Sequence, residues 1–372
     1  MINKDRLVEE FLELVQIDSE SGNEAEIASV LKAKLEALGL EVTEDDTKEV
    51  TGLGSGNLIA RLKGTVESAD PILFNCHFDT VTPGKNVKPI INGDMIETDK
   101  TTILGADDKA GIVALFEGIR LLKEGNIAHG DIEIVLTAGE EIGLLGAIAV
   151  DKKSLNAKYG FTLDSGGSVG EIIVASPDHA KLEAKVYGVA AHAGVAPENG
   201  VSAIEIAAHA ITNMPLGRLD EELTANIGMI SGGERTNIVC DLVEIKAEAR
   251  AITFSKLQNQ MKLMIEAIEN AATKRGCKVD IEVSYQRVGY KLEEIDRVVE
   301  VAKTAVTKIG RTANLQATGG GSDANIFTIG GIPTANLGVG YLDIHSKDEK
   351  MPISELVKLS ELVVEIIKVV AD

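Results

Sequence analysis

The stretch PILFNCHFDTVTPG, residues 71–84, places polar side chains at the end of a buried strand. Residues 71–74 are apolar throughout, which is typical of a strand covered on both faces. His77 and Asp79 follow two positions apart, and side chains i and i+2 of a strand point to the same side. An imidazole and a carboxylate are therefore expected side by side where the strand stops. Strand ends of this kind are where open α/β sheets build their binding sites.

Strands and helices alternate on both sides of this stretch. Further strands are expected at 57–62, 132–137 and 160–163, and helices at 4–16, 109–123 and 144–151. The strands at 72–76 and 132–137 are largely apolar, so both of their faces should be covered by helices in an α/β sandwich. Residues 21–24, SGNE, fit a capping box that opens another helix, which should end near Gly39.

The pattern changes after Pro177. The segments 181–187, 243–251 and 281–286 alternate polar and apolar residues, so each strand should have one dry and one wet face. With a strand at 224–230 and helices at 202–213 and 255–274, the order is β-α-β-β-α-β, which is ferredoxin-like. The sequence therefore predicts a first domain in two parts, residues 1–177 and 291–372, interrupted by an inserted α+β domain, residues 178–290.

Composition excludes several classes of protein. The 372 residues are 44% hydrophobic but only 3% aromatic, and the formal net charge is −21. Such a surface repels a phosphate backbone, and few aromatic side chains are available to stack on bases. The three cysteines form no spaced motif, which favours reduced thiols and a cytoplasmic location. The N-terminal segment lacks the apolar core of a signal peptide, and no apolar run reaches membrane-spanning length, so neither nucleic acid nor membrane is expected as a partner.

Five polar clusters are expected to converge at one edge of the larger sheet. Four follow strands, and the fifth begins a helix: His77 with Asp79, Glu140 with Glu141, Asp164, His345, and Asp107 with Asp108. Each alone has an ordinary structural explanation, such as a hydrogen-bonded pair, a solvated turn or a helix N-cap. Together they supply imidazole and carboxylate ligands, which suit zinc. They are too many for one tetrahedral ion and enough for a pair that activates water and polarises a carbonyl.

The motifs HFDTV, GADDKAG, TAGEEIG, LDSGG, GVAAHAG and GGGSDAN, with the late His345, resemble the di-zinc exopeptidases that include peptidase T, carboxypeptidase G and aminoacylases. GADDKAG is most similar to the peptidase T branch. The resemblance spans residues 77–345 and extends to the order of the domains. It implies a zinc-exopeptidase-like α/β sandwich whose inserted ferredoxin-like domain serves as a lid and a dimerisation domain, and therefore a homodimer.

The resemblance also implies a role for each motif residue. One zinc ion would be held by His77, Asp107 and Asp164, and a second by Asp107, Glu141 and His345, so that Asp107 bridges them. Cobalt or manganese can replace zinc at such ligands. Asp79 would orient the His77 ring. Glu140 would be the general base, which takes a proton from the attacking water and delivers it to the leaving amine. The peptide bond between Asp107 and Asp108 is expected to be cis.

Three residues of the inserted domain complete the expected site. His192 would reach the partner subunit's site and stabilise the oxyanion, while Asn237 and Arg250 would bind substrate. Each has an alternative: His192 can cap a carbonyl within its loop, and Arg250 can belong to an ion pair across the sheet.

These observations predict a metal-dependent exopeptidase that hydrolyses short peptides, specifically an aminopeptidase of the tripeptidase type. A carboxypeptidase or an N-acyl-amino-acid deacylase is the alternative on the same zinc pair. A catalytically inactive binding protein would lack a ligand or Glu140, and here the set is complete. A di-metal nuclease is opposed by the acidity of the chain and its few aromatic residues.

Overall fold

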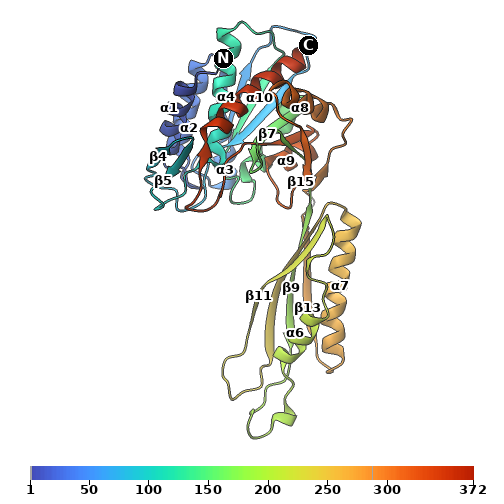
Figure 1. Cartoon of the computed structure of the whole chain (residues 1–372). Coiled ribbons are helices and arrows are strands. Elements are labelled where there is room, and N and C mark those ends of the chain that lie inside the picture. The colour runs from blue at the N-terminus through green and yellow to red at the C-terminus, as the bar shows by residue number, and fades with distance from the viewer. Residues whose placement is uncertain (1, 287) are drawn as a thin grey trace. The chain divides into compact units, whose positions relative to one another are not determined.

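The computed structural model describes residues 2–286 and 288–372, which form two compact units (Figure 1). Unit 1 comprises Met1–Val174, Leu292–Gln316 and Gly321–Asp372, and unit 2 comprises Ala175–Lys291 and Ala317–Gly320. The inserted range expected from the sequence, residues 178–290, lies within the first segment of unit 2.

A mixed sheet forms the centre of unit 1. Its strand order is β1-β2-β6-β3-β7-β16-β8-β14, with β15 beside β8. The strands are β1 (Glu41–Glu44), β2 (Leu58–Leu62), β3 (Ile72–His77), β6 (Ile132–Thr137), β7 (Tyr159–Ser165), β8 (Glu171–Ser176), β14 (Tyr290–Lys291), β15 (Asn314–Ala317) and β16 (Thr334–Gly338). Strands β6, β3, β7 and β16 run parallel. Their carboxyl ends consequently share one edge of the sheet, which is the edge where the polar clusters were expected.

Helices cover both faces of this sheet, which confirms the α/β sandwich. Asn75 and Cys76 of β3 are adjacent and so point to opposite faces. Asn75 bonds Asp323 at the start of α9 (Asp323–Ile329), whereas Cys76 contacts Asp108 in α4 (Ala106–Glu124). On the α4 side lie α8 (Arg297–Lys308), α10 (Ile353–Ala371) and α1 (Lys4–Val15); α4 and α10 pack against each other (Figure 1).

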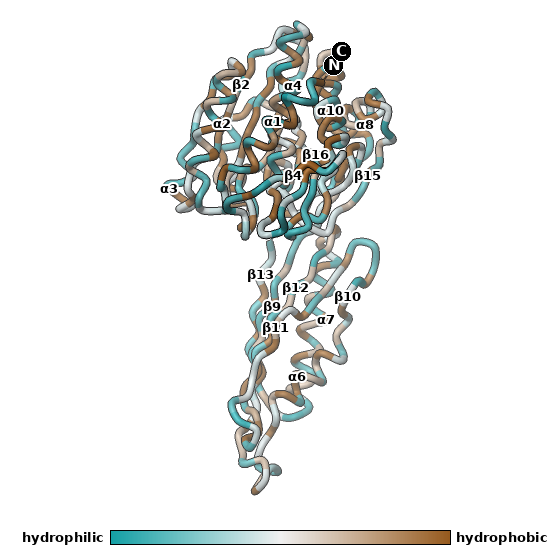
Figure 2. The backbone as a smooth tube through the Cα atoms, turned by 60° about the vertical axis from the view of Figure 1, so that its left-hand side comes forward, coloured by the Kyte–Doolittle hydropathy of each residue, from teal (hydrophilic) through white to brown (hydrophobic). Residues whose placement is uncertain are grey.

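The core of unit 1 is aliphatic. Every residue of β3 and β6 is buried, as the largely apolar pattern predicted. Figure 2 shows α10 as predominantly hydrophobic, and eleven of its residues are buried. Phe74 and Phe161 are among the few aromatic residues in this core, and their ring centroids lie 5.7 Å apart.

The remaining elements of unit 1 are short, apart from α2 (Ala25–Ala37). They comprise α3 (Thr47–Thr51), α5 (Leu145–Ala149), and a small sheet made of β4 (Pro89–Asn92), β5 (Met95–Thr98) and β17 (Met351–Pro352). The capping box expected for α2 was wrong. Glu24 is the N-cap, and the Ser21 hydroxyl donates instead to Asp79, because the chain turns here toward the end of β3.

Unit 2 has the expected β-α-β-β-α-β order, with one short strand added. Its sheet runs β10-β11-β12-β9-β13, and α6 and α7 pack on one face. The elements are β9 (Asp178–Tyr187), α6 (Ala203–Thr212), β10 (Gly217–Arg218), β11 (Leu223–Gly232), β12 (Leu242–Ala251), α7 (Phe254–Thr273) and β13 (Val279–Gln286). Burial alternates along β9, where Leu182, Ala184 and Val186 join the core, as the sequence pattern predicted.

Within residues 2–286 and 288–372, none of the helices combines the length and the apolar composition that a bilayer crossing requires.

Candidate metal centre

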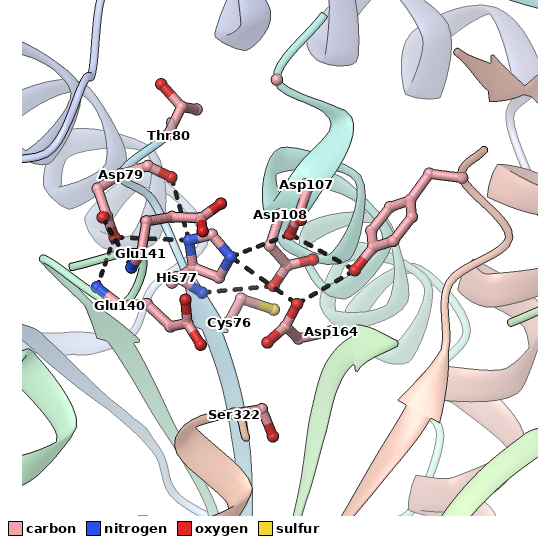
Figure 3. A network of polar contacts seen from close by, with 12 residues as sticks. Cys76, His77, Asp79, Thr80, Asp107, Asp108, Glu140, Glu141, Asp164 and Ser322 are labelled. Atoms are coloured by element: carbon pink, nitrogen blue, oxygen red, sulfur yellow. Dashed lines mark hydrogen bonds and ion pairs between the residues drawn. The ribbon is translucent and has the colours of Figure 1, made fainter. Parts of the chain in front are cut away.

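The polar clusters of unit 1 meet at the carboxyl edge of the four parallel strands. His77 ends β3, Asp164 lies near the end of β7, and Glu140 and Glu141 follow β6. His345 comes from the loop after β16. Asp107 is supplied by the first turn of α4, which packs against β3 and β7. Figure 3 shows His77 between Asp79 on one side and Asp107, Asp108 and Asp164 on the other.

The first group of potential ligands is His77, Asp107 and Asp164. His77 Nε2 lies 3.0 Å from Asp107 Oδ1 and 3.8 Å from Asp164 Oδ1. One ligand atom from each of the three residues lies within 4.8 Å of the others. His77 is only 2% exposed, so its ring is held in place by packing as well as by these contacts.

The second group is Asp107, Glu141 and His345. His345 Nε2 lies 2.9 Å from Glu141 Oε1 and 3.2 Å from Asp107 Oδ2. Asp107 thus belongs to both groups and presents Oδ1 to His77 and Oδ2 to His345. This is the arrangement that a carboxylate shared by two ions requires.

Glu140 lies beside both groups. One carboxylate oxygen of Glu140 is within 4.8 Å of a ring nitrogen of His77 and of an oxygen of Glu141. Glu140 sits on the turn that ends β6, and its backbone N–H donates to Asp79 Oδ1 at 2.9 Å. This hydrogen bond restrains the backbone from which the Glu140 side chain extends.

Asp79 contacts both the His77 ring and the turn that follows β6. The nearest acceptor to His77 Nδ1 is the main-chain oxygen of Asp79, at 3.0 Å, and the carboxylate oxygen Oδ1 is at 3.5 Å. The carboxylate also accepts from the backbone N–H groups of Glu140 and Glu141 and, at 2.6 Å, from the Ser21 hydroxyl. Asp79 consequently contacts the His77 ring, most closely through its main-chain oxygen, and its carboxylate holds the Glu140–Glu141 turn.

The start of α4 is irregular where it supplies Asp107. Asp107 and Asp108 have non-helical backbone angles, and the peptide bond between them is cis, which confirms the expectation. Asp108 Oδ2 accepts from the backbone N–H of His77 at 3.3 Å. Asp108 thereby connects α4 to the end of β3 rather than facing solvent.

Two residues that the sequence did not single out also belong to the site. The Tyr341 hydroxyl donates to Asp164 Oδ1 at 3.1 Å and lies 3.4 Å from Asp107 Oδ1. Glu349 accepts from the backbone N–H of Asp107. Sequence offered a weak signal for both, since they flank His345 in the segment that returns to the strand ends.

The charges of this cluster strongly influence one another. Burial, followed by the charge of Asp107, raises the pKa of Asp164 well above its usual value, and burial likewise raises the pKa of Glu140. Burial opposes ionisation of Asp107, but hydrogen bonds from His345 and His77 outweigh it and lower the pKa of Asp107. Hydrogen bonds to Asp107 and Glu141 raise the pKa of His345 to about 10.

This donor set fits divalent metal ions. Four carboxylates and two imidazoles converge, and ionising all of the carboxylates together without cations is costly, as the raised pKa values of Asp164 and Glu140 indicate. Burial raises the pKa of the nearby Cys76 thiol, which disfavours the thiolate form that would bind a metal ion. Nitrogen and oxygen ligands of this kind suit zinc, cobalt or manganese.

The remaining expected site residues, His192, Asn237 and Arg250, belong to unit 2. His192 is exposed and next to Asn237 in space, because the Ala193 N–H donates to the Asn237 carbonyl at 3.0 Å. Arg250 lies near the other end of β12. Its guanidinium donates to Glu248 and to the main-chain oxygen of Gly319. Arg250 therefore forms an ion pair, but within β12 and not across the sheet as the alternative from the sequence had it.

Comparisons with known proteins show similarity to peptidases. The sequence model of the peptidase dimerisation domain matches residues 175–275, and that of peptidase family M28 matches residues 57–203. The structure of the aminopeptidase PepT from Bacillus cereus is 56% identical, with a TM-score of 0.96 and full coverage of both chains. That of a tripeptidase from Staphylococcus aureus is 45% identical, with a TM-score of 0.96, covering 100% of this chain and 99% of that one.

Peptidase T from Fusobacterium nucleatum is 32% identical over 291 residues, which are 77% of this chain and 70% of that protein. The chain belongs to the peptidase T family. Membership of the peptidase T family makes it a metallopeptidase, as the motifs predicted. The match of the dimerisation model to residues 175–275 also falls on the ferredoxin-like unit, as expected for peptidase T relatives.

Proposed function

We propose that this protein is an aminopeptidase of the tripeptidase type that uses two metal ions. The observation that carries the proposal is the position of Asp107, whose two oxygens face His77 and His345 while Glu140 lies beside them. Similarity to the aminopeptidase PepT and to a tripeptidase supports the substrate class.

In this proposal His77, Asp107 and Asp164 hold one ion, and Asp107, Glu141 and His345 hold the other. When bound, the two ions activate water and polarise the scissile carbonyl. Zinc is the proposed metal, and cobalt or manganese would also fit the donors. Tyr341 donates to Asp164 and thereby restrains the orientation of that carboxylate.

Glu140 moves the proton. Its carboxylate takes a proton from the attacking water and passes it to the nitrogen of the leaving amine, as a general base and then a general acid. The turn that carries Glu140 is anchored by Asp79, so the carboxylate needs little reorganisation before it acts.

We also propose a homodimer formed through unit 2. Strand β10 covers β11 only at Thr224 and Ala225, and the following part of β11 carries Met229 and Ile230, which are 64% and 54% exposed. An uncovered strand edge with exposed apolar side chains favours pairing with another chain. The match to a peptidase dimerisation domain supports this assignment.

The length of β12 indicates how the residues of unit 2 would be shared in such a dimer. Arg250 lies eight residues beyond Leu242, or about 26 Å at 3.3 Å per residue, and Asn237 lies before Leu242. An extended tripeptide spans only about 10 Å. If Arg250 and Asn237 contact the same substrate, we infer that they come from different subunits, with His192 accompanying Asn237.

Hydrolysis of matched peptides tests the proposed function. A tripeptide with a free N-terminus should be cleaved after its first residue, and the N-acetylated peptide should not. Chelation should abolish cleavage, and zinc, cobalt or manganese should restore it. Glu140→Gln should reduce kcat by about 10²–10⁴-fold while retaining both metals.

Three outcomes would each overturn part of this proposal. Preferential cleavage of the acetylated peptide would assign a deacylase, and release of the C-terminal residue would assign a carboxypeptidase. Loss of both metals from Glu140→Gln would make Glu140 a ligand rather than the base.

A further inference from the structure

Glu349 is a buried carboxylate that accepts hydrogen bonds from the backbone of the loop ending at Asp107. Its Oε2 accepts from the N–H groups of Leu104, at 2.7 Å, and Gly105, at 2.8 Å, and its Oε1 accepts from that of Asp107 at 3.1 Å. The residue is 1% exposed. Three backbone donors on one carboxylate are a strong, charge-assisted anchor.

Glu349 connects two segments that each carry a proposed metal ligand. It lies four positions after His345, in the segment that returns past the strand ends, whereas the three donors belong to the loop that enters α4. One side chain thus ties the segment that supplies His345 to the segment that supplies Asp107. The two side chains come within 3.2 Å, between His345 Nε2 and Asp107 Oδ2.

We propose that Glu349 is a positioning residue that sets the spacing of Asp107 and His345 and so determines how tightly the second metal ion is held. The proposal rests on the function proposed above. Glu349 does not touch the ion in this scheme; it acts through the backbone of Asp107. Groups that orient metal ligands in this way typically change metal affinity by about 10–100-fold when they are replaced.

The substitution Glu349→Gln directs its effect at Asp107. An amide has one accepting oxygen, so at least one backbone N–H loses its acceptor. The orientation that keeps two of the three bonds places the oxygen at Leu104 and Gly105 and the NH₂ group against the N–H of Asp107. The loop stays attached, and only the bond that ties the backbone of Asp107 to the segment carrying His345 is lost.

Glu133→Gln is the matched control. Glu133 is also buried, its Oε2 accepts from the N–H groups of Asn156 and Ala157 at 2.7 and 2.9 Å, and its Oε1 pairs with Arg61. It lies near the start of β6, at the opposite end from the metal centre. It therefore reproduces the loss of a buried carboxylate without touching a ligand.

The experiment measures zinc binding to chelator-treated protein by competition with a chromogenic chelator, together with the rise in Tm that zinc produces. Wild type and Glu133→Gln should each bind two equivalents of zinc, and the affinities of the variant should equal those of wild type. The Tm of Glu133→Gln should be lower than that of wild type. Glu349→Gln should keep one tight site, bind the second ion about 10–100-fold more weakly, and show a smaller zinc-induced rise in Tm. In a His345→Ala background, which already lacks the second site, Glu349→Gln should change zinc affinity little further.

Each other outcome identifies a specific failure. Unchanged affinities in Glu349→Gln, with only a lower Tm, would make Glu349 purely structural. An equal further loss in the His345→Ala background would also overturn the positioning role. If Glu349→Gln does not fold, Glu349→Asp, which withdraws the carboxylate by one methylene, must show the same selective loss. Failure of wild type itself to bind two ions would instead overturn the proposed function.

Discussion

Among single residues, Asp107 bears on the candidate centre most directly, because both of the ligand groups proposed to hold an ion contain it. Replacing it should therefore cost more metal than replacing a residue of one group. We expect Asp107→Asn to retain little of either ion, and Asp164→Asn and His345→Gln to retain one equivalent each. Metal analysis after gel filtration in metal-free buffer measures this. Single, equal losses in all three variants would argue against a shared carboxylate.

As a proposed metal ligand, His345 should make metal binding depend on pH. Hydrogen bonds to Asp107 and Glu141 raise the pKa of His345 to about 10, so the metal-free protein holds this proton throughout the neutral range. A metal ion needs the neutral imidazole and must displace the proton. Apparent zinc affinity should therefore rise with pH below about 10, by about tenfold per pH unit for this histidine alone.

Zinc titrations at pH 6, 7 and 8 in the same ionic strength measure this dependence. His345→Ala should bind less zinc with a shallower dependence on pH. An affinity of the wild type that does not change over this range would contradict the assignment of His345 as a ligand.

At the scale of elements, α1 is joined to α4 by a buried carboxylate. Glu117 of α4 receives a bidentate pair from Arg6, with both bonds at 2.8 Å, and a bond from the Asn3 N–H at 3.0 Å. Its side chain is fully buried, whereas Glu124, which pairs with the same arginine, is 55% exposed.

Glu117→Ala should therefore lower the free energy of unfolding by about 2–3 kcal/mol, because buried donors lose a charged acceptor. Glu124→Ala should stay within about 0.5 kcal/mol of wild type, as exposed ion pairs contribute little. Urea denaturation of the metal-free proteins compares the two. Equal effects would mean that burial does not distinguish these pairs.

Element type was predictable from sequence where one periodicity dominates. The apolar run of β6 and the strict polar–apolar alternation of β9 predicted strands at the right positions. The order of the predicted helices and strands indicated both the α/β sandwich of unit 1 and the ferredoxin-like unit. The sequence does not predict the helix α9, because the helix directly follows a glycine-rich stretch that is typical of a turn. For Ser21 the sequence predicts a local cap, because a sequence does not reveal that Asp79, 58 positions away, is the acceptor.

The residues of the candidate site also differ in whether the sequence could predict them. Histidines and carboxylates at the ends of strands, such as His77 and Asp164, could be predicted because strand ends meet at one edge. Tyr341 and Glu349 could not, since their roles depend on tertiary contacts with Asp164 and with the loop before Asp107.

For the whole molecule, the proposed exchange of residues between subunits can be tested by mixing. Glu140→Gln and His192→Ala should each be inactive alone. After the subunits exchange, a hybrid dimer contains one site with both residues intact if His192 acts on the partner's site, so activity should return to a fraction of wild type. No recovery after exchange verified by mass spectrometry would place His192 in its own subunit's site or outside the site altogether.

The contact of Tyr341 with the acidic cluster gives the protein an optical signal of its own. The chain has no tryptophan and five tyrosines, so its ultraviolet emission comes chiefly from phenol rings. A phenol that donates to a carboxylate emits weakly, and Tyr341 donates to Asp164 and lies beside Asp107. Cations that engage these carboxylates should thus alter the emission of one tyrosine in five. Tyr341→Phe should abolish that change, which would allow metal loading to be followed without any added dye.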